Sequence, residues 1–141
     1  MNIKIVNQGK DISRVIINDT KTYNSLSTKN LLDLIKVFKK LDNDKKVKVI
    51  ILEGAGKGFS AGHNLKEVRG LKKKEKYQKL FSLCSKLMIQ IVEGKKPVIA
   101  KVHGAAYAAG CQLVASCDLA YSTKDALFAT PGVNIGLFCS T

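Results

Sequence analysis

Residues 97–119 read PVIAKVHGAAYAAGCQLVASCDL, and this stretch decides the predicted fold. It opens with the apolar run VIAKV, whose β-branched composition and length are typical of a strand buried in a sheet. Glycines and alanines follow, and they leave so little side-chain volume that another backbone or a ligand can approach closely. Apolar residues then recur at helical spacing. The stretch therefore predicts a strand, a close approach and a helix that begins near Ala109 and Gly110.

The predicted helix start is a candidate binding point. The first turn of a helix has backbone N–H groups without intrahelical partners and carries partial positive charge. Such a group can hold an anion or stabilise an oxyanion that develops during a reaction.

Residues 54–65, GAGKGFSAGHNL, form a second segment of small residues, after a predicted strand at 47–52. The segment is not a nucleotide-binding loop, because it lacks Gly-x-x-x-x-Gly-Lys-Ser/Thr and no Gly-x-Gly-x-x-Gly opens a helix. A flexible turn would explain the glycines but not the neighbouring Phe59, Ser60 and Ala61. We interpret it as a loop that contributes to the site.

The remaining segments predict one α/β domain. Alternating and helical patterns indicate an opening hairpin and two long amphipathic helices that cover a sheet. The predicted elements are strands at 2–6 and 12–18, a helix capped by Ser25 or Ser27, a helix at 75–93, a strand at 119–121 preceded by a structural Asp118, and an inward-packing segment at 133–138.

Composition and charge narrow the function. The chain has 141 residues, is 45% hydrophobic and has a net charge of +13. Because 22 of its 24 basic residues are scattered lysines, a solvated surface explains the charge best, a polyanionic small molecule such as CoA comes second and nucleic acid last. With no apolar run of about 18 residues and no apolar leader at the N-terminus, a cytoplasmic protein is the default expectation.

The four cysteines are predicted to bind no metal, because they show no Cys-x-x-Cys spacing and do not cluster with the two histidines. Cys84, Cys111 and Cys117 lie among apolar residues and are expected to be reduced thiols of the core.

Three segments together, 97–119, GKGFSAGHNLKEVRG at 56–70 and ATPGVNIGLFCST at 129–141, resemble the crotonase superfamily, the enoyl-CoA hydratase/isomerase family. The resemblance implies an α/β fold, the ClpP/crotonase spiral of ββα units, with only its N-terminal core portion in residues 1–141. The family's C-terminal helical region forms trimer contacts, so a trimer or hexamer is expected only for a full-length version. The isolated chain is expected to aggregate or to be unstable.

The resemblance also implies a site. The backbone N–H groups of His63 and Ala109, with Gly110 beside them, would bind the oxygen of an acyl-CoA thioester. Asn64 and Ala109 replace an aspartate and a glycine of many relatives without removing a backbone donor. The CoA thioester is the implied ligand, with no metal, nucleic acid or membrane partner. The residues expected on the CoA side are Ser60, Ala61, Gly62, Asn64, Leu65 and Lys66.

Two positions argue against ordinary hydratase chemistry. Hydratases of the family use two glutamates as general acid and base, and those positions hold Gln112 and Gly132 here. Neither residue can take a proton from water at neutral pH. Three hypotheses remain: an acyl-CoA enzyme with other chemistry, such as a decarboxylase; a non-catalytic acyl-CoA binder; and, as the weakest, a basic module for nucleic acid.

Some side-chain roles stay open. The imidazole of His63 either acts as an acid or base beside the thioester, or has no role because only the main chain of this residue takes part. His103 is expected to be a hydrogen-bonded structural residue. The decarboxylase hypothesis rests on the run SAGH at residues 60–63, which is also similar to methylmalonyl-CoA decarboxylase. That relative uses a tyrosine near the position of Phe138 or Cys139, and this chain lacks it.

Overall fold

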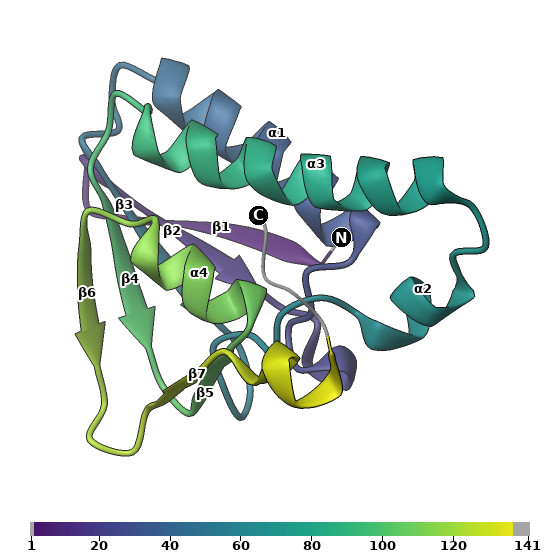
Figure 1. Ribbon diagram of the computed structural model, residues 1–141. Helices are drawn as coiled ribbons and strands as arrows, with labels where there is room; N and C mark the ends of the chain where they lie inside the picture. Colours follow the sequence, from purple (N-terminus) through teal and green to yellow (C-terminus); the bar gives the residue numbers. More distant parts are fainter. Residues whose placement is uncertain (1, 137–141) are drawn as a thin grey trace.

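The computed structural model describes residues 2–136 and shows an α/β arrangement with helices over one face of a sheet (Figure 1). A five-stranded sheet has the order β1-β2-β3-β4-β6, and a small second sheet pairs β5 with β7. The strands are β1 (Ile3–Gln8), β2 (Ile12–Ile17), β3 (Val49–Gly54), β4 (Val98–Val102), β5 (Ala105–Tyr107), β6 (Leu119–Ser122) and β7 (Leu127–Ala129). The α-helices are α1 (Thr28–Asn43), α2 (Leu65–Gly70), α3 (Lys74–Val92) and α4 (Ala109–Ala115), and the 3-10 helices are η1 (Thr20–Thr22) and η2 (Pro131–Ile135).

The large sheet combines an opening hairpin with parallel strands. β1 and β2 are antiparallel, whereas β2, β3, β4 and β6 run parallel to their neighbours. Parallel neighbours need crossover connections, and α1, α3 and α4 lie in the three crossovers. The carboxyl ends of β3 and β4 therefore lie at the same edge of the sheet, where the two segments of small residues begin.

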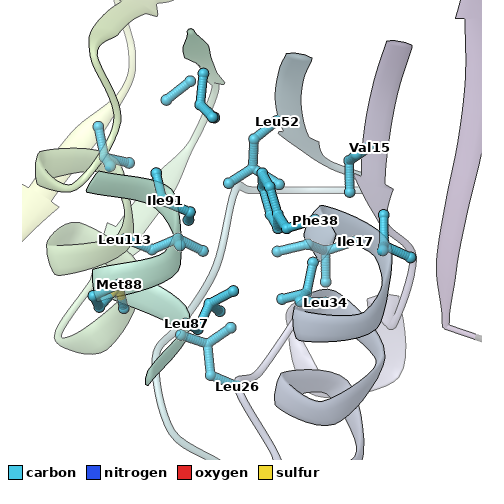
Figure 2. Close-up of a cluster of buried hydrophobic side chains, with 14 of the residues drawn as sticks. Val15, Ile17, Leu26, Leu34, Phe38, Leu52, Leu87, Met88, Ile91 and Leu113 are labelled. Carbon is cyan, nitrogen blue, oxygen red and sulfur yellow. The ribbon is translucent and has the colours of Figure 1, made fainter. Parts of the chain in front are cut away.

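The core lies between this sheet and the helices α1 and α3, which run side by side over it (Figure 1). Apolar side chains at intervals of three and four residues give each helix one buried stripe. Figure 2 shows these side chains converging from α1, α3, α4 and the sheet. The labelled residues are Val15, Ile17, Leu26, Leu34, Phe38, Leu52, Leu87, Met88, Ile91 and Leu113.

Most predicted elements are confirmed. The hairpin, the two long helices, the strand over Val98–Val102 and the helix start at Ala109 lie where the sequence places them. Ser27, not Ser25, caps α1 by accepting a hydrogen bond from the Asn30 N–H. Asp118 is structural as expected, since its carboxylate accepts the Val98 N–H at 2.7 Å.

Two expectations about burial need correction. Val133 and Ile135 do not pack inward, since they are 75% and 64% exposed, and residues 137 and 138 of that segment lie outside the described residues. Of the three cysteines assigned to the core, Cys84 is buried and the other two are half-buried, and no disulfide joins any two of them. Burial, with the nearby Asp118 charge, raises the pKa of Cys117 to about 12, so this thiol stays protonated at neutral pH.

Candidate functional site

The two segments of small residues meet where the loop after β3 reaches the start of α4. Gly62 has a φ of +83°, and a Cβ atom there would lie 2.8 Å from the Tyr107 carbonyl oxygen and 3.1 Å from the Ala109 nitrogen. A Cβ on Gly110 would lie 2.9 Å from the Ser60 Cβ. Real Cβ atoms do not come this close to backbone, so the close approach predicted from composition is confirmed.

Main-chain hydrogen bonds hold the loop against β5. The Ser60 N–H donates to the Ala105 carbonyl at 3.1 Å, and the Tyr107 N–H donates to the Ser60 carbonyl at 2.9 Å. The buried Ser60 hydroxyl donates to the Asn24 carbonyl and accepts the Gly62 N–H. With every polar group of Ser60 engaged, the loop has one fixed position relative to α4.

Two peptide groups of the site have their carbonyls anchored and their N–H groups free. The Gly62 carbonyl accepts the Leu26 N–H at 2.7 Å, and the Ala108 carbonyl accepts the Gln112 N–H at 3.1 Å. In a trans peptide the N–H points opposite to the carbonyl, so the His63 and Ala109 N–H groups point away from these anchors. Neither N–H donates to an acceptor within residues 2–136. The structure thus brings together the two residues whose main chains were predicted as donors.

The residue that precedes α4 has strained backbone. Ala108 has φ 50° and ψ −124°, a region that favours glycine, and its N–H donates to the Ala129 carbonyl at 2.8 Å. Such a conformation costs about 1–3 kcal/mol. It persists because neighbours on both sides fix it, and it sets the direction of the Ala109 N–H at the first turn of α4.

Ala108→Gly is therefore expected to raise the free energy of unfolding by about 1 kcal/mol, the relieved strain exceeding the extra entropy of the unfolded chain. The control is Ala109→Gly, one residue further on in helical conformation, which is expected to lower it by about 0.5–1 kcal/mol. Urea unfolding of the two variants measures both signs. Equal destabilisation by both changes would show that position 108 is not strained.

The His63 side chain is largely buried between Leu26 and Phe81. Its Nδ1 lies 3.2 Å from the Leu26 carbonyl oxygen, and its ring meets Phe81 of α3 edge-on, with centroids 5.3 Å apart. Its Nε2 is buried and has no hydrogen-bond partner among the described residues. Burial lowers the pKa of His63, against opposing contributions from the Leu26 carbonyl and the Glu67 charge. The neutral imidazole must therefore carry its proton on Nδ1 to make the bond to Leu26.

A pocket of about 280 Å³ opens beside this loop. Its lining combines residues predicted for the site with a segment that the sequence did not indicate. The predicted ones are Ala61, His63, Asn64, Leu65 and Lys66, and the additional ones are Lys21, Thr22, Tyr23 and Ser25. A larger groove between α1 and α3 holds no predicted site residue.

The additional segment is tied to the loop by Asn24. Its buried amide donates to the Ala55 and Gly58 carbonyls at 2.7 and 2.9 Å, while the Ala61 N–H donates to the Tyr23 carbonyl. Tyr23 and Asn24 both have left-handed backbone. Asparagine tolerates that conformation, but an asparagine alone does not reveal a contact more than 30 residues away. Only the three-dimensional structure adds this segment to the site.

Gln112 and Gly132, the two positions where the family's hydratases have glutamate, lie in α4 and in η2. Gln112 lies one turn after Ala109 and takes part in a further interaction of its own. Gly132 is buried in η2, three residues after the Ala129 carbonyl that holds Ala108. Neither position has a carboxylate. Phe138 and Cys139 lie outside the described residues.

Three further observations complete the description of these residues. His103 is hydrogen-bonded as predicted, with Nε2 2.8 Å from the Gly56 carbonyl oxygen. No three His, Cys, Asp or Glu side chains within residues 2–136 come together as a metal site would require. In the same part of the chain, each helix is too short or too polar to cross a membrane.

Comparisons with known proteins all point to one family. A family model described as enoyl-CoA hydratase/isomerase matches residues 7–141. The chain is 44% identical over 139 residues to the mitochondrial enoyl-CoA hydratase domain-containing protein 3 of Xenopus laevis, covering 99% of this chain and 47% of that protein. It is 34% identical over 137 residues to the short-chain-enoyl-CoA hydratase of Clostridium acetobutylicum, covering 96% of this chain and 52% of that protein. The chain spans about half the length of these curated relatives.

Solved structures agree. An enoyl-CoA hydratase from Mycobacterium smegmatis superposes with a TM-score of 0.96 at 44% identity, covering 99% of this chain and 55% of that one. Human enoyl-CoA hydratase domain-containing protein 3 gives a TM-score of 0.93 at 41% identity, covering 99% and 55%.

The expected cytoplasmic location is contradicted, because relatives at 40–44% identity from five vertebrates are named mitochondrial. The expectation rested on the absence of an apolar leader, and mitochondrial targeting segments are amphipathic and not continuously apolar. A continuous apolar leader is therefore not the signal that a mitochondrial protein carries.

Proposed function

Because this chain belongs to the enoyl-CoA hydratase/isomerase family, we propose that it holds an acyl-CoA with the thioester oxygen between the backbone N–H groups of His63 and Ala109. The superpositions confirm the predicted crotonase-type α/β fold. In each case the chain covers 55% of the solved relative.

One observation carries the proposal: at the contact between the loop and α4, two peptide groups with anchored carbonyls have N–H groups that find no acceptor among residues 2–136. A thioester carbonyl gains negative charge on oxygen when it becomes an enolate or a tetrahedral intermediate. Two fixed donors stabilise that charge without reorganising, and removal of one such donor typically costs 10²–10³-fold in rate. The geometry therefore suits acyl-CoA chemistry of any kind that passes through an oxyanion.

The pocket beside the loop suits the CoA portion. Lys21 and Lys66 bring positive charge to its rim, where CoA phosphates would find ionic partners. Ala61 and Leu65 supply small and apolar surface. Ser60, Gly62 and Asn64 shape the loop: the Ser60 hydroxyl fixes its position, Gly62 permits the close approach, and the Asn64 side chain caps α2 by accepting the Lys66 and Glu67 N–H groups.

The reaction is proposed to differ from ordinary hydration. Without carboxylates at Gln112 and Gly132, the protein can polarise a thioester but has no general base or acid at those positions to activate water. Acyl-CoA binding without turnover is the second candidate, and the same two residues favour it. Turnover of methylmalonyl-CoA would assign the decarboxylase-like enzyme, and its absence would leave the binder.

Binding is tested by retention on CoA-agarose and release by free acetyl-CoA, with binding to duplex DNA measured at low and high salt. The proposal predicts specific release by acetyl-CoA. Retention that acetyl-CoA does not reverse, together with salt-sensitive DNA binding, would favour the basic module.

Crotonyl-CoA hydration is expected to be at least about 100-fold slower than that of a family hydratase measured in parallel, since general acid–base catalysis contributes about 10²–10⁴-fold. The loss of absorbance of the conjugated thioester follows the reaction. The double variant Gln112→Glu with Gly132→Glu is the matched comparison and is expected to hydrate faster than the parent. Rapid hydration by the unaltered protein would overturn the interpretation of these two positions.

A further inference from the structure

The Gly62–His63 peptide is attached to Leu26 by two hydrogen bonds that run in opposite directions. The Leu26 N–H donates to the Gly62 carbonyl at 2.7 Å, and the Leu26 carbonyl faces His63 Nδ1 at 3.2 Å. The first bond fixes the peptide plane. The second attaches the side chain of the residue whose N–H is the proposed donor.

This attachment matters because Gly62 can change its backbone conformation easily. Rotation of the Gly62–His63 peptide about its long axis changes ψ of Gly62 and φ of His63, and a glycine, here at φ +83°, tolerates a wide range of ψ because it has no Cβ. Rotation by half a turn would direct the Gly62 carbonyl to where the His63 N–H now points. It would place an acceptor where the thioester oxygen needs a donor.

The surroundings of the imidazole are built to hold it. Its ring lies edge-on against Phe81, and its Nε2 is buried without a partner among the described residues. A side chain that served as a proton carrier would need a route from Nε2 to water or substrate, whereas the ring's hydrogen-bonding contact within residues 2–136 is the one from Nδ1 to Leu26.

We propose that the imidazole of His63 is a positioning residue: by donating from Nδ1 to the Leu26 carbonyl, it holds its own main-chain N–H toward the thioester oxygen. The inference rests on the proposed acyl-CoA function. It concerns the side chain at position 63, whereas the proposed function concerns only the backbone.

The test separates carbonyl recognition from binding of CoA as a whole. Acetyl-CoA and S-ethyl-CoA differ in the carbonyl oxygen, so the ratio of their dissociation constants reports on the two N–H donors alone. His63→Leu keeps an apolar side chain against Phe81 but loses the donor. His63→Asn keeps a donor at the position of Nδ1. We expect His63→Leu to lower the acetyl/ethyl affinity ratio by at least about tenfold, and His63→Asn to retain it within about threefold.

If His63 had a purely structural role, His63→Leu would lower the affinities for acetyl-CoA and S-ethyl-CoA by the same factor, and this result would overturn the inference. An unchanged ratio in His63→Leu, or loss of turnover with an unchanged ratio, would overturn it too, the latter by assigning the imidazole to proton transfer. A different result would contradict the proposed function itself: the unaltered protein would bind acetyl-CoA no better than S-ethyl-CoA.

Two further readouts follow from the ring itself. Nitrogen-15 NMR of the histidine ring is expected to show the Nδ1-protonated tautomer, and an Nε2-protonated ring would contradict the attachment. Charged groups that face the ring or share its pocket are Glu67, Lys21 and Lys66, and α3 contributes the uncharged Phe81.

Because burial lowers the pKa of His63, the neutral ring predominates in the folded protein above pH 6.5. The unfolded chain binds the extra proton more readily, so stability from this group is present above 6.5 and lost as pH falls through the lowered pKa. Protonation adds a proton at Nε2 and leaves the Nδ1–H donor to the Leu26 carbonyl in place, so the affinity ratio of the folded parent is expected to stay flat through this titration, as in His63→Asn. A parent ratio that falls while the protein stays folded would count against an attachment through Nδ1–H.

Discussion

Gly62→Ala is expected to lower acetyl-CoA affinity by about 100-fold, the largest effect of any single methyl group in the site. The added Cβ would lie 2.8 Å from the Tyr107 carbonyl oxygen and 3.1 Å from the Ala109 nitrogen. These are backbone atoms held by hydrogen bonds, so the loop must move away from α4. The two proposed N–H donors then separate, and calorimetric titration measures the loss.

Gly9→Ala is the matched control. Gly9 also has positive φ, +69°, but a Cβ there would meet nothing within 4 Å. It therefore carries the backbone strain alone, about 1–2 kcal/mol of stability, and acetyl-CoA affinity is expected to stay unchanged. If both variants lose affinity alike, the effect comes from backbone strain and the loop–helix contact is not its source.

Gly110→Ala is expected to lower the free energy of unfolding by about 3 kcal/mol, at the upper end of overpacking effects. The new Cβ would overlap the Ser60 carbonyl oxygen and lie 2.9 Å from the Ser60 Cβ. Ser60 cannot yield, because it is buried and hydrogen-bonded through its N–H, its carbonyl and its hydroxyl. Urea unfolding gives the size of the loss.

Here the comparison is Gly70→Ala, the last residue of α2, where a Cβ would meet nothing within 4 Å. Alanine is the better helix former, so this change is expected to add up to about 1 kcal/mol. The two substitutions are chemically identical, and their opposite signs would come from the neighbours alone. A stabilised Gly110→Ala variant would mean that the loop does not rest on α4 as described.

Local patterns in the sequence predicted most of the fold. The stripes of α1 and α3 and the β-branched run at Val98–Val102 are strong periodic signals. The short elements α2 and β5 were missed, because six and three residues are too few to show a period. β5 forms because it pairs with β7 and Ser60, since its own sequence is only two alanines and a tyrosine.

The sequence predicts which backbones approach each other in the site, because small residues mark those positions. It does not predict which distant groups form hydrogen bonds there. Small residues at Gly62 and Gly110 indicate that backbones approach each other, and they do. The approach of Tyr23 and Asn24 depends on main-chain bonds between distant parts of the chain. Likewise, nothing next to His63 in the sequence indicates that its imidazole faces Leu26.

A binding site made of backbone N–H groups depends little on which side chains its residues carry. The carbonyls of Gly62 and Ala108 accept hydrogen bonds from the main-chain N–H groups of Leu26 and Gln112, so these two contacts do not depend on the identity of a side chain. In the acyl-CoA site proposed above, binding of the thioester would rest on peptide groups and the chemical step on side chains, so either could change while the other is kept.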